Sequence, residues 1–136
     1  MASFVFNAGA DGLTSGGAIT YASDTIKARL TASSVTPNKD DTSMTGYTAI
    51  GTDQTLGSKT KTKDTTNDRE VFSSAAITWT AVAGGSTVGW VTIYKFSVND
   101  AGSTPIAVID VTDTPTNGSD LVLTPDGTNG LFYLQQ

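Results

Sequence analysis

Apolar and polar residues alternate along several short stretches of this chain. The clearest stretch covers residues 26–33, in which the apolar positions are Ile26, Ala28, Leu30 and Ala32 and the polar positions are Lys27, Arg29, Thr31 and Ser33. A period of two is typical of a strand with one face on a core, so it predicts the apolar set buried and the polar set in water. A helix fits less well, because only Ile26 and Leu30 would then share an apolar face.

The second half of the chain is denser in predicted strands. Residues 90–96 are apolar on both faces for most of their length, which predicts a central strand. Further strands are expected at residues 77–81, 105–111, 121–124 and 131–134, and the dipeptides that favour tight turns between them are Asn117-Gly118, Asp126-Gly127 and Asn129-Gly130. The pattern predicts an all-β fold: an antiparallel β-sandwich, Ig-like or jelly-roll-like, of about seven or eight short strands. Its expected core is Ile26, Leu30, Ile77, Trp79, Ile93, Ile109, Leu121 and Leu123.

Two stretches rich in glycine or polar residues are predicted to be flexible. Residues 1–18 are expected to form an N-terminal arm or loop with at most one weak helical turn, and residues 19–136 a single β-sandwich domain. Residues 34–53 are expected to form a second mobile loop. Phe4 and Phe6 lie on one face of a short apolar strand with no evident partner of its own, so they are predicted to anchor the chain to a binding partner.

Residues 54–63 are predicted to form one more strand, with Lys59, Lys61 and Lys63 on one face. Two interpretations stay open for these lysines. They protect an edge strand from unwanted pairing, or they form a stripe that docks on an acidic protein surface.

The chain contains no cysteine and no histidine among its 136 residues. The sequence therefore rules out disulfides, thiolate nucleophiles and cysteine-ligated metal sites, and a catalytic triad that needs histidine. The net charge of −5 shows no basic excess, so no nucleic-acid partner is expected. The N-terminus does not resemble a signal peptide and no apolar run could span a bilayer, so no membrane partner is expected either.

Four groups of residues could carry chemistry, and each has a simpler explanation. The oxygen-bearing residues Asp110, Asp113, Asn117 and Asp120 could bind calcium, but residues of this kind also form turns. Residues 84–89 superficially resemble a phosphate-binding loop, yet a strand and no helix is expected to follow, which favours a hairpin loop. The carboxylates that could pair for hydrolysis are Asp40, Asp41, Asp53, Asp64, Asp68, Glu70 and Asp100, and most are expected in solvated turns. The aromatic residues Trp79, Trp90, Tyr94 and Phe96 could line a sugar platform, but core positions are commoner.

Several runs of residues carry a resemblance to known proteins. Residues 23–34, with the sequence SDTIKARLTASS, lead into Thr36-Pro37-Asn38-Lys39-Asp40, and the later runs are Gly46-Tyr47-Thr48, Ala76–Trp79, Val91–Lys95, Pro105–Asp110 and residues 126–134. In this order and spacing the chain resembles a group of small structural proteins of tailed-phage virions. It departs from them at Phe96-Ser97-Val98-Asn99, where a short polar turn is usual, and in its glycine-rich N-terminal segment, where relatives often look helical.

The resemblance implies a virion component. Because the chain has no histidine and no complete ligand motif, we expect no enzymatic activity, no cofactor and no metal. Such proteins look like capsid decoration (cement) proteins in some phages and like tail- or fibre-associated proteins in others. We expect a decoration protein on the outer surface of the phage head, bound to the major capsid protein or other virion proteins and present as a homo-oligomer on the particle. The alternatives are a receptor- or glycan-binding module of a tail and, less in keeping with the composition, a glycosidase-like enzyme.

Overall fold

Strands dominate the computed structural model, which describes residues 3–14 and 16–135. Along the described chain the elements are β1 (Phe4–Val5), α1 (Asn7–Leu13), β2 (Ile26–Ala32), β3 (Ala49–Thr55), β4 (Thr60–Asp64), β5 (Arg69–Ser73), β6 (Ile77–Trp79), β7 (Thr87–Lys95), a 3₁₀ turn (Asp100–Gly102), β8 (Thr104–Pro115), β9 (Leu121–Leu123) and β10 (Phe132–Gln135). Within those described residues, no helix is both long and apolar enough to cross a membrane.

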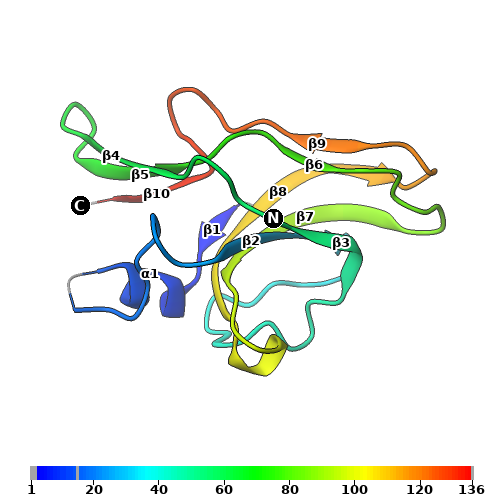
Figure 1. Ribbon diagram of the computed structural model, residues 1–136, viewed down its shortest axis with the longest axis horizontal. Helices are drawn as coiled ribbons and strands as arrows, with labels where there is room; N and C mark the ends of the chain where they lie inside the picture. Colours follow the sequence, from blue (N-terminus) through cyan, green and yellow to red (C-terminus); the bar gives the residue numbers. More distant parts are fainter. Residues whose placement is uncertain (1–2, 15, 136) are drawn as a thin grey trace.

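The strands form three antiparallel sheets. The largest has the order β1-β8-β7-β2-β3, and the two smaller ones are β10-β5-β4 and the pair β6-β9. The smaller sheets lie along one side of the large sheet (Figure 1), so the fold is all-β and sandwich-like, as the sequence predicts. The prediction of a central strand at residues 90–96 is also confirmed for residues 90–95, because β7 is the middle strand of the large sheet and ends at Lys95.

The core between these layers, called here the inner core, is built from the alternating apolar residues. Ile26, Leu30, Ile77, Trp79 and Ile93 are buried in it as predicted, whereas Ile109, Leu121 and Leu123 are half-buried and pack against its margin. Two aromatic rings from neighbouring strands, Phe72 and Phe132, stack with their centroids 4.8 Å apart. The period of two thus identifies the face of the large sheet that meets the smaller sheets.

The opposite face of the large sheet carries a second apolar cluster, called here the outer core: Phe6, Met44, Tyr47, Trp90, Tyr94 and Val108. This cluster explains why the prediction for residues 26–33 is half wrong. Arg29 and Thr31 are 6 % and 0 % exposed, although their polar positions were expected in water. A sheet covered on both faces buries side chains on both sides of its inner strands, and a polar side chain buried there must find a partner. Thr31 finds one in Thr92, with 3.1 Å between the two hydroxyl oxygens.

The N-terminal segment is packed into the fold and is not a free arm where it is described. β1 pairs with β8, and α1 packs against the same strand. Helix α1 forms despite its glycines because one of them allows close contact: a Cβ on Gly9 would lie 2.5 Å from the Cα of Ile106. The seven-residue helix in this segment is longer than the single weak turn that the sequence predicts.

The predicted strand at residues 54–63 is wrong, because the chain leaves one sheet and enters another there. Residues up to Thr55 belong to β3, which pairs with β2, whereas β4 pairs with β5. Between them Leu56 is buried, and Ser58 adopts a positive φ of 49° that ends the extended run. Residues 49–53 of the predicted mobile loop are likewise part of β3.

Candidate docking surface

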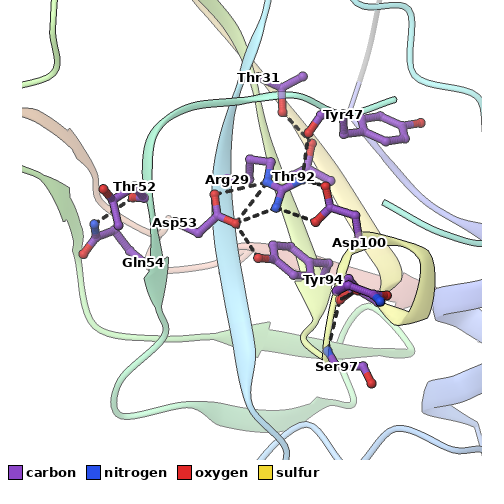
Figure 2. Close-up of polar contacts among 12 residues, drawn as sticks. Arg29, Thr31, Tyr47, Thr52, Asp53, Gln54, Thr92, Tyr94, Ser97 and Asp100 are labelled. Carbon is purple, nitrogen blue, oxygen red and sulfur yellow. Dashed lines mark hydrogen bonds and ion pairs between the residues drawn. The ribbon is translucent and has the colours of Figure 1, made fainter. Parts of the chain in front are cut away.

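Arg29 projects from β2 into the outer core and joins three separate segments of the chain (Figure 2). Its Nε and Nη2 donate to both carboxylate oxygens of Asp53 in β3 at 2.7–3.1 Å. Nη1 donates to the backbone carbonyl of Tyr47 at 2.8 Å. Nη1 and Nη2 also donate to the carboxylate of Asp100, in the 3₁₀ turn, at 3.1 and 2.9 Å. Since a guanidinium has five N–H groups in a fixed plane, one side chain can satisfy all three acceptors.

Tyr94 completes this group, and we refer to Arg29, Asp53, Tyr94 and Asp100 as the Arg29 cluster. The Tyr94 hydroxyl donates to Asp53 across 2.5 Å, and the Arg29 guanidinium lies 5.1 Å from the centroid of its ring. Burial raises the pKa of Tyr94, and the hydrogen bond to Asp53 raises it further. Burial alone would lower the pKa of Arg29, but its hydrogen bonds to Asp53 and Asp100 raise it overall, so the guanidinium stays charged.

The Arg29 cluster holds down the long segment between β2 and β3, residues 33–48, which we call the outer loop. Three further backbone contacts fix the outer loop along its length. The Trp90 indole donates to the carbonyl of Val35 at 3.0 Å, the amide of Asn7 to the carbonyl of Lys39 at 3.0 Å, and the amide of Met44 to the carbonyl of Asp100 at 3.0 Å. The prediction of a mobile loop at residues 34–53 is therefore wrong, because its backbone is tied to three other parts of the fold.

The outer loop is two-sided. On its inner side the side chains of Met44 and Tyr47 are buried, and the ring of Tyr47 packs edge-on against the ring of Phe6 with 5.9 Å between the ring centroids. The Tyr47 hydroxyl donates to Asp41 across 2.5 Å, and burial, followed by this hydrogen bond, raises the pKa of Tyr47 to about 12. Apart from Gly46, the exposed residues are polar, among them Asn38, Lys39, Asp40, Thr42 and Thr45. The result is a polar surface whose shape is fixed by buried contacts.

The predicted anchor Phe6 has no surface to offer a partner. Its side chain is 0 % exposed in the outer core, and Phe4 is half-buried beside it with the two ring centroids 5.1 Å apart. The expectation that these residues lack a partner within the chain is wrong, because β1 brings them onto the large sheet. Anchoring by the partly exposed Phe4 stays a prediction.

The three predicted lysines do not form one equivalent stripe. Lys59 precedes β4, and its ammonium donates to the backbone carbonyl of Asp24 and lies 6.0 Å from the centroid of the Tyr21 ring. Lys61 and Lys63 lie on β4 and are exposed, and their side chains make no hydrogen bond or ion pair within the described residues. Of the three lysines, Lys61 and Lys63 are thus available to a partner, and Glu70 of β5 lies opposite Lys63 in the strand register.

The other candidate residues are distributed through the fold. Asp110 and Asp113 lie in β8, whereas Asn117 forms a turn with the amide of Ser119 and Asp120 accepts from the amide of Ala81. In the part of the chain that the structure describes, no group of three or more carboxylates could hold a metal ion.

Residues 84–86 end the connection (residues 80–86) from β6 to β7, which belong to different sheets, so this glycine-rich segment leads into a strand but is not a hairpin loop. Among the aromatic residues Trp79, Trp90 and Tyr94 are buried, as expected of core positions. Phe96 is 39 % exposed, with the Lys27 ammonium 3.9 Å above its ring.

The carboxylates considered for hydrolysis are mostly engaged inside the chain. Asp53 and Asp100 share Arg29, and Asp41 accepts from Tyr47. Asp64 accepts from Asn67 and from Arg69, and these hydrogen bonds, in that order, lower its pKa to about 2.

Sequence reasoning missed Arg29 because a charged residue in an alternating strand is normally solvated.

Comparisons of the chain with protein-family models, with curated proteins and with solved structures give no match.

Proposed function

We propose that this chain is a non-enzymatic structural protein of a tailed-phage virion, and specifically a decoration protein on the outer surface of the head. The observation that carries the proposal is the outer loop, a polar surface held in one shape by the Arg29 cluster and by the contacts of Trp90, Asn7 and Met44. A surface that is ordered before binding loses less conformational entropy on docking, which favours tight attachment without turnover.

The runs that resemble virion proteins coincide with this construction. The SDTIKARLTASS run is β2 with its flanks and contains Arg29, whereas Thr36–Asp40 and Gly46-Tyr47-Thr48 belong to the outer loop. Tyr47 supplies the carbonyl that Arg29 binds. The shared pattern thus covers part of the Arg29 cluster and part of the outer loop that the cluster orders, as expected if the surface of that loop serves a common structural role.

On a capsid the partner would be the major capsid protein, and many copies would bind neighbouring sites. Weak individual contacts become additive in such an array through multivalency. The role requires no cofactor, because it consists of holding shell contacts together.

Gold-labelled antibody raised against the purified chain tests the proposal on intact particles of the phage that encodes it. We expect many labels distributed over the heads and none on the tails. Labels confined to tails or fibres would replace the head location by a tail-associated role. Particles without label, in a preparation whose denatured proteins contain no band that the antibody recognises, would refute the virion assignment.

A further inference from the structure

Strand β4 is an open edge of the small sheet β10-β5-β4. It pairs with β5 on one side, from Thr60 opposite Ser73 to Asp64 opposite Arg69, and no other described strand pairs with it. Residues 60–63 are all exposed. An edge strand directs alternate backbone N–H and C=O groups outward, so it is a template on which a further strand can pair.

A groove lies beside this edge. Its volume is about 590 Å³, which is within the range of binding clefts. One wall consists of Thr60 and Thr62 of β4 with Val71 and Ser73 of β5, and the other wall is the turn that includes Thr124 and Thr128. Thr60 and Thr62 alternate along the strand, so the groove follows the face to which every second side chain of an added strand would point. Hydroxyl side chains are the most numerous in its lining, which also includes the carboxylates of Asp64 and Asp126, so the groove suits small neutral polar side chains and not acidic ones.

The charge along the edge selects the kind of strand. Lys61 and Lys63 are the two free cations identified above, and they are two residues apart on β4. A second copy of this chain is disfavoured, because antiparallel pairing centred on Thr62 would place Lys61 opposite Lys63 of the other copy, and like charges directly opposite are destabilising. A strand with acidic residues at alternate positions would instead place opposite charges beside Lys61 and Lys63.

We propose that the β4 edge binds an extended acidic segment of another protein, which joins the sheet as a strand next to β4. Its Asp or Glu side chains lie against Lys61 and Lys63, and its intervening small polar side chains enter the groove. This inference rests on the proposed function in one respect: in the virion, the segment belongs to a neighbouring structural protein. The same lysines that prevent self-pairing thereby specify the partner.

A designed peptide tests the edge without any virion. The probe is acetyl-Thr-Glu-Thr-Glu-Thr-Glu-Thr-amide, added to the isotope-labelled full chain and followed by amide chemical shifts. We expect shifts concentrated at residues 60–64, 71–73 and 124–128, together with new protection of alternate β4 amides from hydrogen exchange. A Gln-for-Glu peptide should bind less tightly, and a Lys-for-Glu peptide should not bind.

The double variant Lys61→Gln/Lys63→Gln should weaken binding of the acidic peptide by about two- to thirtyfold, the value of two exposed charge pairs. Lys39→Gln is the matched control: it removes an exposed lysine of the outer loop and should leave the affinity unchanged.

Three results would overturn the proposal: shifts that map elsewhere, an unchanged affinity in the double variant, or equal binding of single-stranded DNA, which would indicate a general response to polyanions. The antibody labelling of particles does not depend on β4. Labelled heads without peptide binding would therefore refute only the proposal that β4 binds an acidic strand. Peptide binding without labelled particles would refute the proposed virion role and leave the proposal for β4 standing.

Discussion

Replacing Arg29 by methionine should be among the most damaging single changes in this chain. The side chain of Arg29 is 7 % exposed and that of Asp53 is 14 % exposed, so the substitution leaves a buried carboxylate with the Tyr94 hydroxyl as its remaining donor among the described residues. It also removes the donor of the Tyr47 carbonyl. Removing one partner of a buried ion pair costs about 3–5 kcal/mol, whereas the loss at Asp100, which is 52 % exposed, adds no more than about 1 kcal/mol.

The measurement is equilibrium unfolding in urea, followed by tryptophan fluorescence, because both tryptophans of the chain are buried. The control is Lys27→Met, which removes a cation two positions earlier on β2. Lys27 is half-buried and rests on the Phe96 ring, so its loss should cost less than about 1 kcal/mol.

A double-mutant cycle separates the ion pair from general packing. Asp53→Asn keeps an acceptor for the Tyr94 hydroxyl but removes the charge that Arg29 compensates. In the double variant the loss should be smaller than the sum of the single losses by about 1 kcal/mol or more. Under native conditions, the Met44 amide should also exchange faster in Arg29→Met, because its acceptor is the backbone of Asp100. The structural role of the Arg29 cluster would be refuted by a loss of stability below about 1 kcal/mol for Arg29→Met, or by a loss in the double variant equal to the sum of the two single losses.

Three further outcomes follow from burial. Phe6→Ala should destabilise the fold by about 3–5 kcal/mol in the same urea assay, since Phe6 is fully buried; a loss near zero would restore it as a surface anchor. Leu30→Ala should cost about 2–5 kcal/mol, and a loss under about 0.5 kcal/mol would contradict the register of β2. Burial raises the pKa of Tyr21 and Tyr94, and that of Tyr47 to about 12, whereas an unfolded tyrosine ionises near pH 10. A group whose pKa is raised in the folded state stabilises the fold fully below its unfolded pKa of about 10, and this contribution is lost as the pH rises. The free energy of unfolding should therefore fall as the pH rises towards 12, and tyrosinate absorbance should appear together with unfolding. Ionisation of these tyrosines in a chain that keeps its native circular dichroism would contradict their burial.

The inner core could be predicted from the sequence because the alternation that marks its residues lies within a few consecutive positions of the chain. In β2, alternation of Ile26 and Leu30 with polar residues shows which side faces the smaller sheets. The same pattern could not reveal that the polar side is covered too. Burial of Arg29 depends on acceptors 18, 24 and 71 residues away in the chain, and no local period encodes contacts of that kind.

Two other errors have identifiable physical causes. Glycines made a helix at residues 7–13 look unfavourable, but packing outweighs propensity here, because Gly9 lets α1 approach the backbone of β8 more closely than any side chain would allow. The lysine alternation suggested one continuous strand at residues 54–63. Gly57-Ser58 was the signal of a break, since such a pair accommodates the turn by which the chain passes from one sheet to the next.

Charged residues thus act in two opposite ways in this chain. Arg29 is buried, and its value lies in the number of segments that a single planar cation can join, which orders the outer loop before any partner arrives. Lys61 and Lys63 are exposed, so water screens them and they add little to the stability of the fold. Exposed charges act mainly on the encounter with a partner and on the choice between partners, whereas a preordered surface lowers the entropic cost of staying bound. The array proposed above would need both properties, because each copy would have to reject other free copies and yet remain attached once docked. In this fold the two properties lie on different sheets, so a substitution can alter partner choice at β4 without loosening the surface that Arg29 holds.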